Sequence, residues 1–493
     1  MQIPFGEWLP DQPAHGMKGA NVATNVYHAL GSYKRFPSLV SYSGTSTTTK
    51  DAHGSGSFRD NSNVVYNFAA TKTDIYQLAS GAFTSRKGSL NGDDDDFFTF
   101  TQFGQYVIAS NGVDAAQFYL MGTSTNFAAL TSIQTAGTCP LFRVSGVVRD
   151  FLVTGNIANA TNRIQWSGIN DITTWSGKQS DFQDLPGSGG QVVHITSGEV
   201  GYVFRQNQIV RMDYVGGAVV FRLSVISPNR GAVYGRTVCQ DNRRVFFYAD
   251  DGFYEIQGDT VAPIGVEKVN RFFDLNLNKA FSDRICAAVD PFNQLALWLY
   301  PSASNTANTT GICDKILIYN YATQKWSTAD ANASTIFSQF VGAYTVELMD
   351  IISENLDQIN IALDTDFWSG GQLLLGAIDS NFKAAIFSGT ENQGTIETRE
   401  LELFPGHRSS ITNVRPIVDA TATVTIKSKE RLSDDATVST SSSMVASGDN
   451  PVRQSGRYFR IQVITPSGTP WTHAQGVDLK ASRIGLRWRT KLI

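Results

Sequence analysis

Short apolar runs alternate with turn residues along most of the chain, a pattern that predicts strands rather than helices. One unit has apolar runs at 98–103, 106–109 and 117–120, with breaks at Gly104 and at Asn111-Gly112. Three such runs joined by tight turns are typical of an antiparallel meander. We therefore expect an all-β protein.

Similar meanders recur at 202–223, 244–264 and from about 287 to 319, and comparable openings stand at Val64 and Val147. Units that restart every 35 to 55 residues or so are typical of radial β repeats, in which each blade buries both faces against its neighbours. The pattern favours a β-propeller over residues 61–395. A string of sandwich domains would give the same alternation, so that alternative stays open.

The two ends of the chain have a different texture. Residues 1–60 are rich in Gly, Ser, Thr and Pro, which indicates an extended N-terminal arm that ends in a polar loop. Residues 396–493 have longer alternating runs at 421–427 and 458–464, which favour an additional C-terminal β-sandwich-like domain. The stretch 347–361 fits a short helix or a strand with turns equally well.

Composition supports a globular protein without an obvious redox or metal site. The 493 residues are 42% hydrophobic and 17% charged, which is enough apolar material for more than one core. The four cysteines are scattered singly and the six histidines lie far apart, so neither a disulfide framework nor a zinc site is predicted. No signal peptide or membrane-spanning run is visible, so we expect a protein made or assembled in a cytoplasm.

Charge is distributed unevenly. The net charge is -4, which argues against a general nucleic-acid binder. Residues 451–493 carry eight basic groups against Asp478 alone, a balance of +7 that leaves -11 for the rest of the chain. The basic end could dock on an acidic partner, or its cations could simply face solvent on edge strands. The candidate docking residues are Arg453, Arg457, Arg460, Arg483, Arg487 and Arg489.

An acidic run, Asp93, Asp94, Asp95 and Asp96, follows the turn residues Asn91-Gly92. Four successive carboxylates repel one another unless water or a cation screens them, so a solvated loop is the simplest interpretation. A loop that lines a DNA passage is an alternative, because negative charge keeps phosphates from adhering. A calcium loop fits less well, since the ordered alternation of ligands is absent.

Signatures of catalysis are missing. The sequence has no H-E-x-x-H, G-x-S-x-G, G-x-x-x-x-G-K-[ST] or G-x-G-x-x-G motif, and the Gly-rich stretch 186–190 reads as a loop between blades. Glu199, Glu255 and Asp290 are carboxylates that a glycan-cleaving propeller would need, but nothing in the sequence pairs them. Trp166 and Trp175 flank a Gly-containing turn and are expected to pack there. We predict neither a catalytic site nor a cofactor.

Short motifs are spread over most of the chain. In the N-terminal region they are Trp8, Pro10-Asp11, Ala23, Asn25-Val26, Gly31-Ser32-Tyr33 and Phe36-Pro37-Ser38-Leu39. Later blocks are Val148-Arg149-Asp150-Phe151, Gln165-Trp166-Ser167-Gly168, Asp251-Gly252-Phe253-Tyr254, Ala288-Val289-Asp290-Pro291 and Arg457-Tyr458-Phe459-Arg460. Trp471 and Gly476-Val477-Asp478 complete the set. Together these motifs resemble the nozzle, or tail-stabilisation, proteins of short-tailed bacteriophages.

The resemblance implies a structural virion protein whose propellers form a sixfold ring, a homohexamer, below the portal and adaptor. Such a ring would hold the DNA channel closed until genome ejection. Expected partners are other copies of the chain, an adaptor or portal-proximal tail protein, and a tail needle, tail fibre or tailspike. Double-stranded DNA would pass without specific binding, and the virion tail would assemble in the host bacterial cytoplasm. The alternatives are a receptor- or glycan-binding propeller tail protein, able to cleave glycan or not, and a cytoplasmic scaffold.

Overall fold

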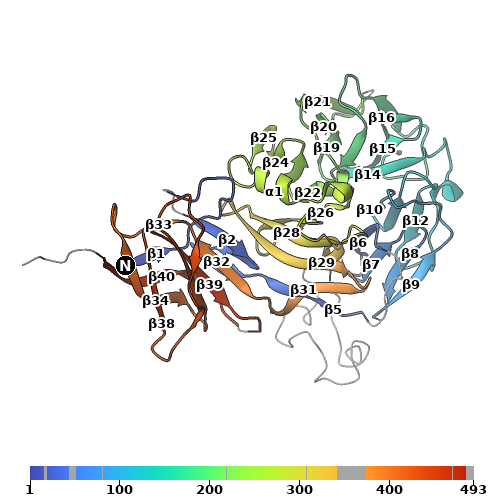
Figure 1. Cartoon of the computed structure of the whole chain (residues 1–493). Helices are drawn as coiled ribbons and strands as arrows, with labels where there is room; N and C mark the ends of the chain where they lie inside the picture. Colours follow the sequence, from blue (N-terminus) through green and yellow to red (C-terminus); the bar gives the residue numbers. More distant parts are fainter. Residues whose placement is uncertain are drawn as a thin grey trace, which may run out of the picture.

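The computed structural model of the chain describes residues 1–15, 19–43, 51–79, 81–217, 219–306, 308–340, 373–468 and 470–484 (Figure 1). The ambiguous stretch 347–361 lies outside these ranges, as do Arg487 and Arg489. Strands dominate the described ranges, and the helical elements within them are one α-helix, α1 (Asn270–Asn276), and three short 3-10 turns, η1 (Leu130–Ile133), η2 (Gly235–Thr237) and η3 (Lys279–Arg284). The predicted all-β class is confirmed.

Five four-stranded antiparallel sheets follow one another along the chain as the first five blades of a propeller. The first two contain β6 (Gly54–Arg59), β7 (Val65–Ala70), β8 (Ile75–Ala79) and β9 (Ala82–Lys87), then β10 (Thr99–Phe103), β11 (Tyr106–Ser110), β12 (Gln117–Leu120) and β13 (Ala128–Ala129). The third and fourth contain β14 (Phe142–Val148), β15 (Phe151–Ile157), β16 (Ala160–Trp166) and β17 (Asp181–Asp184), then β18 (Val192–Ile195), β19 (Val200–Arg205), β20 (Ile209–Tyr214) and β21 (Phe221–Ser227). The fifth contains β22 (Cys239–Asp241), β23 (Arg244–Ala249), β24 (Gly252–Gln257) and β25 (Thr260–Pro263).

One long strand, β29 (Lys325–Phe340), belongs to two further blades. Its first half pairs with β28 (Cys313–Asn320) and completes the sixth blade with β26 (Cys286–Asp290) and β27 (Leu295–Tyr300). Its second half pairs with β30 (Leu373–Asp379), which continues through β31 (Ala384–Glu391) to β5 (Pro37–Ser41). The described residues thus form seven blades, and a strand from the N-terminal region is the outermost strand of the last.

The seventh blade closes the ring against the first. The Ser55 and Thr335 hydroxyls lie 3.3 Å apart, and the backbone N–H of Phe340 donates to the Ser57 hydroxyl (2.8 Å). Apolar clusters fill the spaces between successive blades, as a propeller requires. Glycine permits the close approach of inner strands, because a Cβ on Gly54 would lie 2.5 Å from the carbonyl oxygen of Phe98.

A two-sheet sandwich adjoins the propeller, as predicted for the C-terminal region. One sheet contains β1 (Gln2–Pro4), β3 (Val26–Ala29), β4 (Ser32–Arg35), β40 (Ala474–Arg483), β34 (Ser409–Val418) and β38 (Asn450–Gly456). The other contains β2 (Ala20–Thr24), β32 (Gly394–Thr398), β39 (Tyr458–Thr465), β35 (Thr423–Lys429), β36 (Thr437–Val438), β33 (Leu401–Glu402) and β37 (Ser442–Ser443). Buried residues such as Val414, Val424, Ile461 and Val477 form the core.

The N-terminal segment is extended, as expected, and it is built into both domains (Figure 1). Strands β1 to β4 belong to the sandwich, and β5 belongs to the seventh blade. β2 also pairs in parallel with β29, where Thr24 lies opposite Thr328. The sandwich therefore combines the two ends of the chain rather than residues 396–493 alone. No helix within the described ranges is long and apolar enough to span a membrane.

Candidate functional site: the axial cavity of the propeller and its rim

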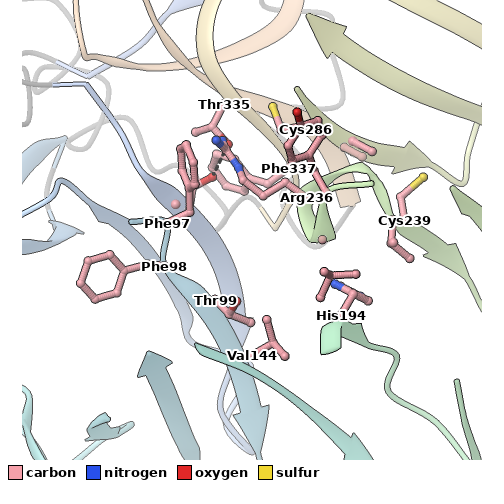
Figure 2. A pocket seen from close by; sticks show the side chains of 18 of the residues that line it. Phe97, Phe98, Thr99, Val144, His194, Arg236, Cys239, Cys286, Thr335 and Phe337 are labelled. Atoms are coloured by element: carbon pink, nitrogen blue, oxygen red, sulfur yellow. Dashed lines mark hydrogen bonds between the residues drawn. The ribbon is translucent and has the colours of Figure 1, made fainter. Parts of the chain in front are cut away.

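A cavity of about 510 Å³ lies on the propeller axis, enclosed by the innermost strands of all seven blades (Figure 2). Each of these strands contributes at least one residue, and examples in blade order are Ser55, Thr99, Val144, His194, Cys239, Ala288 and Thr335. The wall therefore combines residues that are far apart in sequence.

The acidic run lies at the rim of this cavity, between β9 and β10. Asp96 is buried, and its carboxylate accepts hydrogen bonds from Arg143 (2.6 Å) and from the backbone N–H of Asp93 (3.0 Å). Asp94 is exposed and forms an ion pair with Lys72 (2.7 Å), which holds the pKa of Asp94 below its ordinary value. Asp95 is exposed and lines the cavity.

The four carboxylates therefore have different roles. Asp96 stabilises the conformation of the loop through its hydrogen bonds, while Asp93, Asp94 and Asp95 are exposed at the surface of the loop. Within the described part of the chain, no group of three or more His, Cys, Asp or Glu side chains is arranged to hold a metal ion. Whether the loop also faces a passage formed between protomers stays a prediction.

An aromatic and cationic cluster follows the acidic run. The guanidinium of Arg236 lies 4.2 Å from the centre of the Phe97 ring, and that of Arg284 lies 5.6 Å from it. The His53 ring stacks on Phe97 at 5.3 Å, and its Nδ1 donates to the carbonyl oxygen of Asp96 (2.8 Å). Phe97 thus joins the acidic loop to residues that precede the fifth and sixth blades.

Two histidines at the cavity are neutral near pH 7. Burial lowers the pKa of His53 to about 4, and the nearby Arg284 and Arg236 act in the same direction. Burial also lowers the pKa of His194 to about 4. Among the described residues that line the cavity, the positive charges are therefore those of Arg143 and Arg236.

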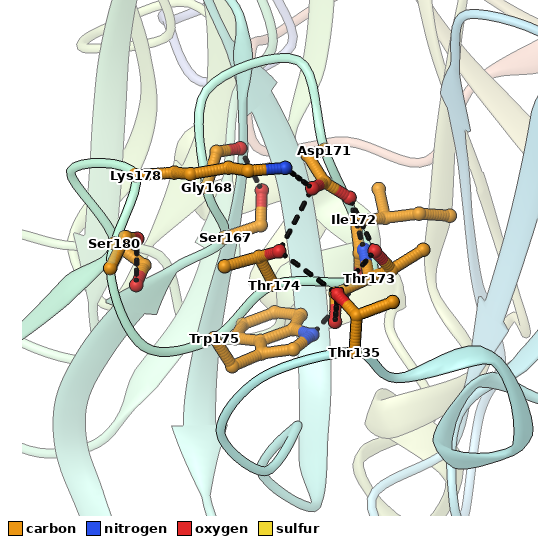
Figure 3. Close-up of polar contacts among 11 residues, drawn as sticks. Thr135, Ser167, Gly168, Asp171, Ile172, Thr173, Thr174, Trp175, Lys178 and Ser180 are labelled. Atoms are coloured by element: carbon orange, nitrogen blue, oxygen red, sulfur yellow. Dashed lines mark hydrogen bonds and ion pairs between the residues drawn. The ribbon is translucent and has the colours of Figure 1, made fainter.

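Trp166 and Trp175 are buried and pack at a blade turn, as expected, and Figure 3 shows Trp175 beside the turn. Their indole N–H groups donate to the carbonyl oxygens of Gln179 (2.8 Å) and Ile172 (2.9 Å). The Asp171 carboxylate organises the turn. It accepts hydrogen bonds from the backbone N–H and the hydroxyl of Thr173, from the hydroxyl of Thr174 and from the ammonium group of Lys178. Burial alone would raise the pKa of Asp171, but these hydrogen bonds hold it well below its ordinary value. The turn is structural.

The basic residues of the C-terminal region divide into two groups. Arg457 pairs with Glu402 (3.0 Å) and Arg460 pairs with Glu400 (3.1 Å), so both are engaged inside the sandwich. Arg453 and Arg483 are exposed, and the structure records no ion pair for either among the residues it describes. A docking role for these two stays a prediction.

The three carboxylates considered for glycan cleavage are not brought into one site. Glu255 forms an ion pair with Arg244 (2.6 Å) in the fifth blade. Asp290 accepts hydrogen bonds from the backbone N–H of Phe292 (3.1 Å) in its own turn in the sixth blade. Glu199 is exposed between β18 and β19. The Gly-rich stretch 186–190 is a loop between the third and fourth blades, as expected, and the buried Arg205 donates to its carbonyl oxygens.

No family model and no curated protein matches the chain. Among solved structures, a chain of the Mitotic Checkpoint Complex is 11% identical with a TM-score of 0.41, covering 74% of this chain and 98% of that one. BamB from Moraxella catarrhalis is 11% identical with a TM-score of 0.39, covering 74% and 96%. The Pan2 WD40 domain from Neurospora crassa is 7% identical with a TM-score of 0.38, covering 71% and 94%. The likeness concerns the fold alone.

Proposed function

We propose that the chain is a structural protein of a virion tail, the nozzle of a short-tailed bacteriophage, and not an enzyme. In this proposal identical copies form a sixfold ring around the DNA channel below the portal and adaptor. The observation that carries the proposal is the position of the residues on which the family resemblance rests. In the N-terminal region they lie at the junction of the sandwich with the propeller.

Trp8 and Asp11 attach the N-terminal segment to the connector between the fifth and sixth blades. Trp8 is buried, and its ring contacts Phe272 of α1 edge-on at 4.9 Å. The Asp11 carboxylate accepts hydrogen bonds from the backbone N–H groups of Arg271 (2.8 Å) and Phe272 (2.7 Å). Because the first N–H groups of a helix lack partners within it, this carboxylate stabilises the start of α1.

Asn25 joins β2 to the long strand β29. Its backbone has a φ of 59°, a conformation that asparagine tolerates better than most residues. Its side chain accepts a hydrogen bond from the backbone N–H of Asp330 (2.8 Å) and donates to the Asp330 carboxylate (3.1 Å) and to the carbonyl oxygen of Gln393 (3.0 Å). One side chain therefore contacts both the propeller and the strand that enters the sandwich.

Gly31 and Tyr33 shape the next hairpin. Gly31 has a φ of +74° in the turn between β3 and β4, and the hydroxyl of the buried Tyr33 donates to the carbonyl oxygen of Gly6 (2.8 Å). Phe36 is also buried, directly before β5 enters the seventh blade. The motif thus encodes a particular union of propeller and sandwich, which a propeller alone would not require. This supports a relationship with proteins that share the motif.

The charge distribution fits a ring of identical copies. A head-to-tail interface joins one face of a protomer to a different face of the next, so opposite charges on the two faces favour closure. Arg453 and Arg483 are exposed on the sandwich, while the chain before residue 451 carries a net charge of -11 against the +7 that follows. We expect the basic face of one sandwich to contact the acidic surface of the next protomer.

Electron microscopy of the purified chain, alone and mixed with the other tail proteins of the phage, tests the proposal. A sixfold ring with a central pore is the expected particle. The double variant Arg453→Glu/Arg483→Glu should weaken the ring, whereas Arg222→Glu, on an exposed guanidinium of the propeller, should leave it intact. A compact trimer would favour the receptor-binding alternative, and a monomer under all conditions would reject the nozzle.

A further inference from the structure

Arg236 presents an unpaired guanidinium to the axial cavity. The residue lies in η2, directly before the fifth blade, and lines the cavity wall (Figure 2). Its Nη2 atom is buried and has no hydrogen-bond partner among the described residues, and no carboxylate of that set lies within ion-pair distance. The guanidinium is partly exposed and contacts the Phe97 ring, so it places a positive charge at the cavity that an anion can balance.

The other cations nearby have acidic neighbours. Arg143 pairs with Asp96 at 2.6 Å. Arg284 lies 3.8 Å from both Asp51 and Asp283. Of the three arginines, Arg236 is therefore the one that has no carboxylate partner among the described residues, and it can pair with one negative charge.

The rest of the wall suits an apolar body. Phe97, Phe337 and Val144 supply apolar surface, and Thr99 and Thr335 supply hydroxyls. The volume of about 510 Å³ lies within the range of small-molecule sites, which are mostly apolar with a few polar groups that fix orientation. Among the described residues, the cavity therefore combines room, an aromatic surface and a cation without a carboxylate partner.

We propose that the axial cavity binds a small organic carboxylate, whose anionic end pairs with Arg236 and whose apolar body contacts Phe97 and Phe337. Because Nη2 is sealed against the protein, the carboxylate would accept a charge-assisted hydrogen bond from Nε or Nη1 of Arg236. A phosphate dianion fits less well, because its second charge would have no partner and would lie near the exposed Asp95 at the rim. The inference does not depend on the nozzle assignment.

Titration calorimetry with phenylacetate as the probe tests the site in the full-length chain. Phenylacetate should bind, whereas 2-phenylethanol, which has the ring without the charge, and inorganic phosphate, which has charge without a ring, should bind at least about tenfold more weakly. Arg236→Gln should weaken phenylacetate binding about tenfold or more, and Arg236→Lys should restore part of it. Arg222→Gln removes an equivalent guanidinium from the outer surface and should change nothing.

Stability supplies a second readout. Arg236→Gln loses the contact of the guanidinium with Phe97, so each variant is compared with its own melting temperature without ligand, and phenylacetate should raise the melting temperature of the unmodified chain only. Absence of phenylacetate binding at millimolar concentration would overturn the proposal. Equal binding by Arg236→Gln, or a crystal soak that places the probe elsewhere, would also overturn it.

Discussion

Replacing Trp166 by alanine should destabilise the interface between the third and fourth blades. The indole is 4% exposed, and its ring meets Phe221 edge-on at 5.2 Å. Its N–H donates to the carbonyl oxygen of Gln179 (2.8 Å). Removing a buried aromatic side chain costs about 3 to 5 kcal/mol, because the contacts are lost and a cavity remains.

Two further variants separate the contributions. Trp166→Phe keeps most of the buried ring and loses the hydrogen bond, so it should cost about 1 kcal/mol. Phe182→Ala is a matched control, because Phe182 is an aromatic residue of the adjacent strand β17 that is 50% exposed. Its contact with Arg163 is worth about 1 kcal/mol or less at such a site.

Hydrogen exchange measured by mass spectrometry is the appropriate assay. The chain has two domains, so a single unfolding transition cannot be assumed. Exchange instead reports the opening free energy of β15 and β16 themselves. Unchanged protection of these strands in Trp166→Ala, or an equal loss in Phe182→Ala, would refute the packing role of the indole.

Three other predictions concern the cavity rim and the N-terminal segment. The pKa of His53 is about 4 in the folded chain and 6.5 ordinarily, so its contribution to stability is complete above about pH 6.5 and is lost as the pH falls towards 4. Denaturant titrations of His53→Gln should therefore show a weaker dependence of the unfolding free energy on pH over that window. Arg399 donates to carbonyl oxygens within residues 9–13, so Arg399→Met should cost about 1.5 to 3 kcal/mol and speed proteolysis of that segment; an unchanged cleavage rate would contradict this. In assembled particles Asp95→Lys should slow genome ejection while leaving the fold intact, whereas Asp96→Lys should disrupt the rim; normal ejection with Asp95→Lys would place the loop away from the DNA.

Local pairing explains which parts of the fold could be predicted from the sequence. The meander at 98–120 is β10 to β12, and its Asn111-Gly112 turn has Gly112 at a φ of +81°, as turn residues of this kind permit. The seventh blade could not be predicted in this way. Its outermost strand is β5, which pairs with β31 more than 300 residues later, and its innermost strand is the second half of β29. Periodicity carries no information about such distant partners.

The candidate site shows the same limit. The sequence shows four successive aspartates, but it does not show that Asp96 is buried against Arg143, since these residues belong to neighbouring blades. Arg236 has no sequence signal at all, because it is a single arginine in a connector and its importance comes from a ring of neighbours on other strands. Once the blades are located, the connector residues directly before each innermost strand are the positions from which a side chain such as that of Arg236 can reach the cavity.

The double use of the N-terminal segment links the stability of the two domains. β5 completes the seventh blade, while β1 to β4 pair within the sandwich a few residues earlier. Asn25 and the Thr24–Thr328 pair hold this segment to β29, which is itself shared by two blades. Because one continuous stretch makes all these contacts, a force that pulls the sandwich away from the propeller acts directly on the strand that closes the ring. The ring of blades should therefore open only when the sandwich contacts also yield, which in the nozzle that we propose would keep each protomer intact under load.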